Sequence, residues 1–188
     1  MTLASNATHP VAPAGTAPPA TSRAIRVLAD GRAEPVPVPA GAWVTLLDAL
    51  RAAGRTEVKE ACHEGRCGAC AVLVDGELRL SCLVLAARAA GAAVTTAASP
   101  ECGRAAEAIA ACGAVQCGYC TPGVVVCLTW AEAGGASAEE ALAATICRCG
   151  CHPGFRQAAT ALGLPAAPAT GADLGTGPDG RAAETRRG

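Results

Sequence analysis

The sequence predicts an α+β protein built from two small domains, a sheet-containing domain followed by an all-helical domain. Up to about residue 97, apolar residues alternate with polar ones between Asp-Gly turns, which is typical of half-buried strands. After Ser99-Pro100 these strand signals stop and Ala-rich helical patterns replace them. A chain of 188 residues has room for two such domains. The predicted domains are residues 23–97 and 98–164.

The first domain is expected to begin with a hairpin at the edge of a sheet. Ile25 and Val27 alternate with polar neighbours, and Asp30-Gly31 supplies a turn. Val36 and Val38 alternate in the same way on the return strand, among prolines that cannot donate ladder hydrogen bonds. Such a strand is tolerated only at an edge.

A short helix, a second hairpin and a closing strand complete this domain. Thr45 followed by Asp48 predicts a helix start, with leucines at helical spacing as far as Gly54. Asp75-Gly76 joins two further apolar runs into a hairpin. A last strand is expected at Val94-Thr95-Thr96. One helix on a small mixed sheet is the predicted unit.

Four short helices are expected in the second domain. Proline suits the first turn of a helix, and a Ser three residues before a Glu forms a capping box. Joined by Gly-rich turns, such helices predict a small bundle. The expected boundaries are Glu101–Cys112, a start at Pro122, a capping box at Ser137 and Glu140 for a helix to Ile146, and a last helix from Pro153 to near Gly163.

The two ends of the chain are predicted to be disordered. Residues 1–22 and 165–188 are rich in small residues and proline and carry no periodic apolar pattern. Residues 1–22 also lack the basic and apolar regions of an export signal, which predicts a reducing compartment, the cytoplasm. The uncharged stretch Ala108–Ala131 is interrupted by Gly and Pro, so no membrane span is expected. A net charge of −1 gives no electrostatic footprint for nucleic acid or anionic membrane.

Four cysteines in the first domain have the spacing of a plant-type [2Fe–2S] site, C-x4-C-x2-C-x11-C. Gly65 and Gly68 let their loop bend and bring backbone N–H groups close to cluster sulfurs. A zinc ribbon would pair two short knuckles, and structural disulfides would need an oxidising compartment; both stay open as alternatives. The candidate ligands are Cys62, Cys67, Cys70 and Cys82.

A second set of four cysteines lies in the helical domain, as C-x2-C followed after 26 residues by C-x-C. Both pairs are expected at helix ends, where N-terminal N–H groups favour the negative charge of a cluster. The C-x-C pair is unusual for zinc fingers, although the spacing alone leaves zinc open. The candidate ligands are Cys117, Cys120, Cys147 and Cys149. Outside these motifs, Cys102, Cys112 and Cys127 are expected to be small buried hydrophobes, and His9, His63 and His152 to be structural or exposed.

Both cysteine motifs resemble those of a known family. The first domain carries VKEACHEGRCGAC, from Val58 to Cys70, followed by Val74-Asp75-Gly76 and Ser81-Cys82-Leu83. These runs closely resemble the ferredoxin-like domain of the small subunits of molybdenum hydroxylases, the xanthine dehydrogenase, aldehyde oxidoreductase and carbon monoxide dehydrogenase family. QCGYCTPG and CRC resemble the motifs that bind a second cluster in this family. Over roughly residues 24–160, the resemblance implies a β-grasp ferredoxin-like domain followed by a four-helix [2Fe–2S] domain.

The resemblance also implies cofactors, partners and one further site residue. It assigns a [2Fe–2S] cluster to each set of four cysteines, and a contact with the pterin of the molybdenum cofactor to the side-chain amide of Gln116. From the residues alone, Gln116 is instead a polar residue at a helix terminus. The implied partners are a large subunit holding the molybdenum cofactor and a medium subunit holding FAD, in a heterotrimer or its dimer. Electrons would pass from the molybdenum site through the helical-domain cluster and the ferredoxin-domain cluster to FAD, and no catalytic residue is expected on this chain.

The sequence departs from the family pattern next to the second site. Gly150-Cys151-His152 stands where the family usually has Thr-Gly-Tyr, and the segment between the two cysteine pairs is a few residues shorter than usual. Cys151 is therefore placed to substitute for Cys149 as a ligand.

Two functions of other classes compete with an electron-transfer subunit. A free-standing ferredoxin that shuttles by diffusion would be a stable monomer and would usually need a charged docking face, which the near-neutral charge disfavours. A zinc-stabilised interaction module would be colourless. The motifs favour the subunit of a larger oxidoreductase.

Overall fold

The chain folds as a mixed α+β structure, seen here in a computed structural model that describes residues 24–29, 32–37, 43–134 and 136–165. The predicted disorder of residues 1–22 and 166–188, the turn at Asp30-Gly31 and His9 lie outside these ranges. The strands are β1 (Ala24–Ala29), β2 (Arg32–Pro37), β3 (Ala71–Val74), β4 (Glu77–Leu80) and β5 (Ala93–Thr95). The helices are α1 (Leu46–Ala52), α2 (Gly103–Ala111), α3 (Thr121–Glu132), α4 (Ala138–Ala143) and α5 (His152–Ala161), with short 3-10 helices η1 (Ser81–Leu83), η2 (Ala86–Arg88) and η3 (Pro100–Cys102).

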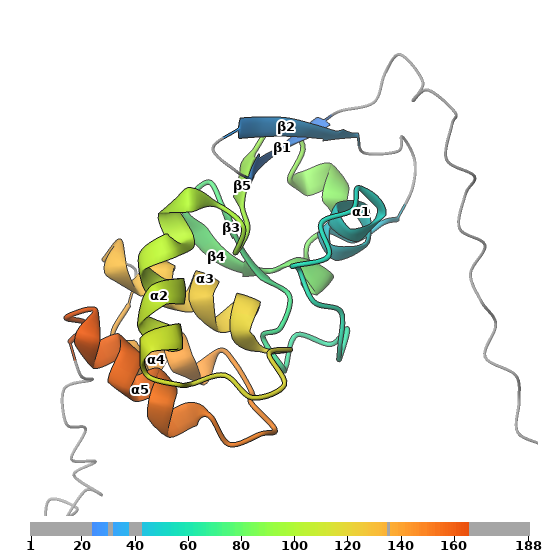
Figure 1. The fold of residues 1–188 in the computed structure, drawn as a ribbon. Coiled ribbons are helices and arrows are strands. Elements are labelled where there is room, and N and C mark those ends of the chain that lie inside the picture. The colour runs from blue at the N-terminus through green and yellow to red at the C-terminus, as the bar shows by residue number, and fades with distance from the viewer. Residues whose placement is uncertain (1–23, 30–31, 38–42, 135, 166–188) are drawn as a thin grey trace, which may run out of the picture.

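The described strands form one sheet in the order β2-β1-β5-β3-β4 (Figure 1). β1 and β5 are parallel, and the other neighbouring strands are antiparallel. β2 is an edge strand, as its prolines predict, because an edge strand needs ladder donors on one side only. The second hairpin is confirmed, with Asp75-Gly76 joining β3 to β4.

α1 begins at the capping box predicted from Thr45 and Asp48. The hydroxyl oxygen of Thr45 accepts a hydrogen bond from the Asp48 N–H at 3.1 Å, and the Asp48 carboxylate accepts one from the Thr45 N–H at 3.2 Å. Each side chain thus satisfies a backbone donor that the helix leaves free. The predicted apolar face is buried, with Leu46, Leu47 and Leu50 fully covered.

α4 begins as predicted but ends three residues early. Ser137 and Glu140 form the expected capping box. The helix stops at Ala143 rather than at Ile146, because the Ile146 N–H donates to the carbonyl of Cys67 at 3.0 Å instead of to a carbonyl of its own helix. A distant acceptor therefore ends the helix, which no local pattern reveals.

α3 is the central helix of the second half of the chain. Pro122 lies in its first turn as predicted, and most of its residues are buried, including Val124, Val126 and Leu128. Among the helices of the described residues, none is long and apolar enough to cross a lipid bilayer.

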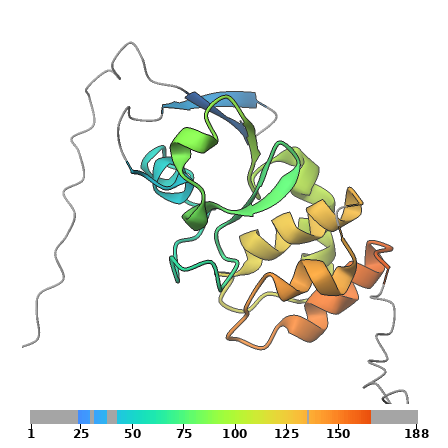
Figure 2. The ribbon, with the colours of Figure 1, turned by 180° about the vertical axis from the view of Figure 1, so that it is seen from behind.

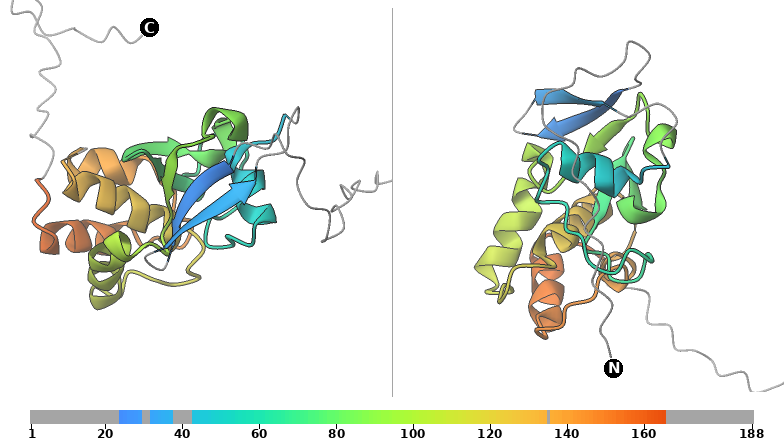
Figure 3. Two further views of the ribbon diagram at one scale, coloured as in Figure 1. Left: turned by 90° about the horizontal axis from the view of Figure 1, so that it is seen from above. Right: turned by 90° about the vertical axis from the view of Figure 1, so that its right-hand side faces the viewer.

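The sheet separates two apolar cores, because successive side chains of β3 point to opposite faces. Val72 packs in a core with the leucines of α1, whereas Ala71 and Leu73 pack in the other core with α3 and its neighbours. Seen from above, α1 lies on one side of the sheet and α2 to α5 on the other (Figure 3); the view from behind shows the same grouping (Figure 2). The helical half therefore shares its core with a strand of the first half.

Candidate metal centres

The four candidate ligands of the first site come from one loop and one short helix. Cys62, Cys67 and Cys70 belong to the loop between α1 and β3, and Cys82 lies in η1 directly after β4. Because β3 and β4 are paired, the hairpin returns Cys82 to the end of that loop. The Cys62 thiol interacts with that of Cys67 and the Cys82 thiol with that of Cys70, and Cys62 also acts on Cys82, so the structure brings the predicted set together.

The loop directs backbone N–H groups at sulfur. Gly65 and Gly68 have φ of 75° and 71°, in the left-handed region that glycine adopts without a steric penalty. Two loop N–H groups donate to Cys62 Sγ at 3.4 Å each. Together with the N–H of Glu64, which has the largest effect, they lower the pKa of the Cys62 thiol to about 6, because N–H dipoles stabilise a thiolate.

The thiols of the first site meet in two pairs, Cys62 with Cys67 and Cys70 with Cys82. Burial, and next the neighbouring Cys70 thiol, raise the pKa of Cys82 to about 11. A buried thiolate without a positive partner is costly. A metal that binds this pair would supply that charge and displace the protons, since thiolates are the ligands.

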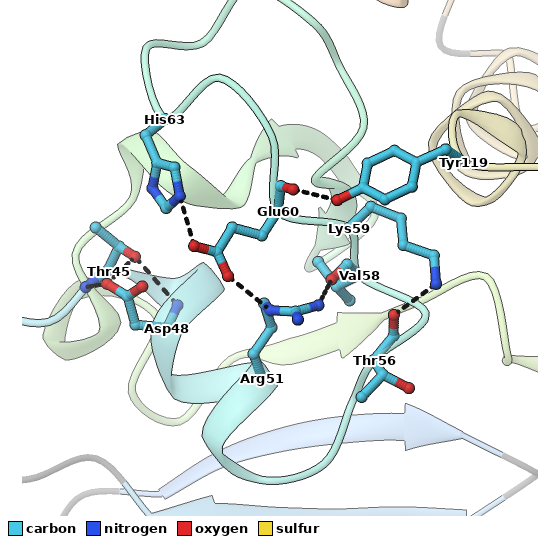
Figure 4. Close-up of polar contacts among 9 residues, drawn as sticks. All are labelled: Thr45, Asp48, Arg51, Thr56, Val58, Lys59, Glu60, His63 and Tyr119. Carbon is cyan, nitrogen blue, oxygen red and sulfur yellow. Dashed lines mark hydrogen bonds and ion pairs between the residues drawn. The ribbon is translucent and has the colours of Figure 1, made fainter. Parts of the chain in front are cut away.

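Polar contacts fix the chain segment on either side of Cys62 (Figure 4). Arg51 of α1 lies 3.1 Å from the Glu60 carboxylate and donates to the carbonyl of Val58 at 3.0 Å. His63 Nε2 lies 2.9 Å from the other carboxylate oxygen of Glu60. These contacts tie the loop to α1 and confirm His63 as a structural residue.

Ser81 fixes the second thiol pair of this site. Its fully buried hydroxyl donates to the carbonyl of Cys70 at 2.8 Å, and its N–H donates to the same oxygen at 3.2 Å. Because Cys82 follows directly, this double contact sets how closely Cys70 and Cys82 approach. The role of Ser81 is not predictable from the sequence, because its acceptor is eleven residues away and a Ser-Cys dipeptide carries no signal of its own.

The four candidate ligands of the second site come from two loops. Cys117 precedes α3 and Cys120 is its N-cap, whereas Cys147 and Cys149 lie between α4 and α5. The predicted helix end is thus wrong for the second pair, because α4 stops early and the chain continues as a loop. The thiols again meet in two pairs, Cys117 with Cys149 and Cys120 with Cys147.

The four thiols of the second site surround a small cavity. Its volume is about 130 Å³, and its lining includes Cys117, Cys120, Cys147, Cys149 and also Cys67 of the first loop. The Tyr119 N–H, and next the Cys149 thiol, lower the pKa of the exposed Cys117. Burial, and next the Cys147 thiol, raise the pKa of Cys120 to about 12. As at the first site, burial and a neighbouring thiol make the thiolate costly, and a bound metal would offset that cost.

Cys147 is positioned by His152, the first residue of α5. The Cys147 N–H donates to His152 Nε2 at 3.1 Å, so that ring nitrogen carries no proton. The ring packs edge-on against buried Phe155, with centroids 5.7 Å apart. His152 is structural, as expected. The sequence did not predict its contact with a candidate ligand, although its position in the first helical turn after the cysteine loop is consistent with one.

The remaining candidates lie apart from the thiol pairs. Gln116 is exposed beside Cys117, and its contact with a pterin stays a prediction. Cys102 and Cys127 are fully buried, which confirms them as small core residues, whereas Cys112 is only half-buried.

The two candidate sites touch through their loops. The Ile146 N–H donates to the carbonyl of Cys67 at 3.0 Å, and the Tyr119 hydroxyl donates to the carbonyl of Glu60 (Figure 4). A missing side chain permits this approach, because a Cβ on Gly123 would lie 2.4 Å from a backbone oxygen of the first loop. The structure thus places the cysteine loops of the second site against the cysteine loop of the first site.

The arrangement of thiols fits a two-iron cluster at each site. All twelve cysteines lie in the described ranges and none is in a disulfide. Within those ranges, no three Cys, His, Asp or Glu side chains converge as ligands of a single metal ion. The candidate thiols meet two by two instead, and each iron of a four-cysteine [2Fe–2S] centre takes two thiolates.

Comparison with known proteins identifies the family. A family model described as a 2Fe-2S iron-sulfur cluster binding domain matches residues 28–97, and one described as a [2Fe-2S] binding domain matches residues 94–160. The chain is 37% identical over 134 residues to the nicotine 6-hydroxylase small subunit of Paenarthrobacter nicotinovorans, covering 66% of this chain and 80% of that subunit. The chain belongs to the small iron–sulfur subunits of the xanthine dehydrogenase and aldehyde oxidoreductase family. The resemblance found in the sequence is confirmed.

Other members of this family of iron–sulfur subunits agree in sequence and in fold. The xanthine dehydrogenase iron-sulfur-binding subunit of Escherichia coli O157:H7 is 46% identical over 88 residues, which span 45% of this chain and 55% of that subunit. The chain therefore spans about half the length of this relative. A crystal structure of quinoline 2-oxidoreductase from Pseudomonas putida 86 superposes with a TM-score of 0.59 at 26% identity, over 76% of this chain and 97% of the matched chain.

Proposed function

We propose that this chain carries two [2Fe–2S] clusters and transfers electrons within a molybdenum hydroxylase-type complex. Bound clusters of this kind supply one-electron redox chemistry. The described residues bring four thiols together at each site, which suits iron and sulfide, and the family membership supports the same cofactor. The proposed ligands are Cys62, Cys67, Cys70 and Cys82 at the first site, and Cys117, Cys120, Cys147 and Cys149 at the second.

The thiol pairs suggest how the ligands divide between irons. At the first site we assign Cys62 and Cys67 to one iron, with Cys70 and Cys82 on the other. At the second site the same reasoning joins Cys117 to Cys149 and Cys120 to Cys147. In both sites one iron would have an exposed or half-exposed pair and the other would hold a buried cysteine.

One observation carries the proposed relay: the hydrogen bond from the Ile146 N–H to the carbonyl of Cys67, at 3.0 Å. Cys67 is a proposed ligand of the first site, and Ile146 is bonded to Cys147, a proposed ligand of the second. The two thiol sets are therefore connected by covalent bonds and a single hydrogen bond. Cys67 also lines the cavity of the second site. This chain's part is to hold the two carriers close together in a fixed arrangement.

The partners we propose are a large subunit with the molybdenum cofactor and a medium subunit with FAD, assembled in the cytoplasm. The relatives named as small or iron-sulfur-binding subunits support partners of this kind. Gln116 is exposed beside the second site, where its amide is free to contact a pterin held by the large subunit. FAD would then receive electrons from the first site.

The first test is an iron and acid-labile sulfide assay on the complex, purified anaerobically after co-expression with the partner subunits. About four irons and four sulfides per chain are expected, as two [2Fe–2S] clusters require. A colourless, zinc-loaded monomer would refute the proposal.

Single substitutions then separate the two sites. Cys70→Ser is expected to remove one of two electron paramagnetic resonance signals of the reduced protein, and Cys117→Ser to remove the other. Each variant serves as the control for the fold of its counterpart. Loss of both signals from a folded variant would contradict the assignment of two independent sites.

A further inference from the structure

The second site contains a fifth thiol. Cys151 is the N-cap of α5 and is only 8% exposed. Its thiol lies against the Cys147 thiol and beside the backbone N–H of Gln116. A sulfur that meets another thiol and a backbone N–H has the surroundings that the proposed ligands share. Buried Cys127 differs, because the polar group beside its thiol is the side chain of Thr145.

The position of Cys151 relates it to one thiol pair in particular. Cys147 belongs to the pair with Cys120, and Cys151 contacts the Cys147 thiol from outside the lining of the cavity. The His152 ring, adjacent to Cys151, accepts the hydrogen bond from the Cys147 N–H and so holds the two cysteines together at the start of α5.

We propose that Cys151 is a reserve ligand of the second site, able to replace Cys147 on the iron that also takes Cys120, rather than Cys149 as the sequence spacing predicts. This rests on the proposed function, because it requires a cluster at that site. In the exchange the Cys151 thiol would give its proton to solvent and its sulfur would bond to iron, while the bond from iron to the Cys147 sulfur breaks and the released Cys147 thiolate takes up a proton from solvent. Iron and sulfide keep their oxidation states, so no oxidant or reductant is needed.

Geometry explains why Cys147 is the residue that can be replaced. When Cys147 is truncated to alanine, its sulfur leaves a space that borders both the cavity and the Cys151 thiol. The Cys117 thiol pairs with that of Cys149 instead of lying beside Cys151, so we do not expect Cys151 to replace it. At the first site, by contrast, the thiols that lie beside Cys62 and Cys82 all belong to other candidate ligands.

The test compares four variants of the full-length chain by iron and sulfide content and by electron paramagnetic resonance of the reduced protein. Cys147→Ala is expected to keep about four irons, with a second-cluster signal shifted by the altered ligand, and Cys147→Ala/Cys151→Ala about two. Cys117→Ala, the matched loss at the other pair, is expected to keep about two irons even though Cys151 is present. Cys151→Ala alone is expected to keep about four irons and the wild-type signals.

The first-cluster signal in every variant reports that the chain is folded. About two irons in Cys147→Ala would overturn the reserve role, as would about four in the double variant or about two in Cys151→Ala. Wild-type protein without iron would refute the proposed function itself. If the wild type holds about four irons and any of these three variant results is found, only the reserve role is refuted.

Discussion

Gly68 lies at the tightest point between the two candidate sites. Its φ is 71°, and a Cβ there would lie 2.0 Å from the backbone oxygen of Ala144 and 2.7 Å from the methyl carbon of Thr145. Gly68→Ala is therefore expected to lower the free energy of unfolding by more than about 3 kcal/mol, because backbone atoms must move. Iron content is expected to fall with it, since Gly68 lies between two proposed ligands. Urea unfolding and an iron assay would measure both effects.

Gly76 provides the matched control for this substitution. Its φ of 84° imposes the same left-handed backbone, but a Cβ there would meet no atom within 4 Å. Gly76→Ala is expected to cost only the intrinsic strain of about 1–2 kcal/mol and to leave the iron content unchanged. Equal losses of stability in the two variants would show that crowding at Gly68 has no effect.

Cys127 is expected to be chemically silent in the folded chain. Its side chain is fully buried, and burial raises the pKa of its thiol to about 12. At pH 8 only about one thiol in ten thousand would be ionised, and the thiolate is the reactive form. Iodoacetamide followed by peptide mass spectrometry should find Cys127 unmodified in native protein and modified in urea. Rapid labelling of native protein at pH 8 would contradict the buried position.

Single residues differ in how far the sequence reveals them. The eight candidate ligands were predictable because cysteines at set spacings carry their chemistry locally. Ser81 and His152 were not, since a serine or histidine acquires its role from a partner that only the fold brings near: the carbonyl of Cys70 for Ser81, and the N–H of Cys147 for His152.

At the level of elements, α4 depends on its capping box. The Ser137 hydroxyl oxygen accepts the Glu140 N–H at 3.3 Å, and the Glu140 carboxylate accepts the Ser137 N–H at 2.9 Å. Ser137→Ala is expected to lower the free energy of unfolding by about 0.5–2 kcal/mol, because a backbone donor loses its partner. Ser137→Gly is expected to lose only about a few tenths of a kcal/mol. Thermal unfolding would measure both, and an equal loss in the two variants would contradict a capping role.

Helix starts were more predictable than helix ends. The capping boxes at Thr45 and Ser137 involve residues three apart, so the signal lies wholly within a few positions of sequence. The end of α4 instead depends on the carbonyl of Cys67, some 79 positions before the Ile146 donor. A hydrogen bond between residues so far apart in sequence depends on tertiary packing, whereas the local sequence pattern favoured a longer helix.

For the molecule as a whole, β3 joins the two halves. Its alternating side chains contribute to both cores, with Val72 on one face and Ala71 and Leu73 on the other. The change from strand to helix signals near residue 98 was visible in the sequence. The contribution of β3 to both cores was not, because the pattern of a buried four-residue strand does not show which elements pack on each of its faces. The helical half is thereby held against the loop that carries the first site.

Gly123, in the first turn of α3, controls how closely the two sites approach. A Cβ there would lie 2.4 Å from the backbone oxygen of Gly68, so Gly123→Ala should push the loops apart. A loss of stability of about 1–3 kcal/mol is expected, as for other overpacked positions. Both clusters should stay bound, while the magnetic coupling between them weakens and electron transfer between them slows, as seen by electron paramagnetic resonance and stopped-flow reduction. Gly103→Ala, in the first turn of α2, adds a Cβ that meets open space, so it should change neither the magnetic coupling nor the rate of electron transfer. Unaltered coupling and transfer in Gly123→Ala, with the loss of stability present, would show that the contact between the loops does not set the distance over which electrons move.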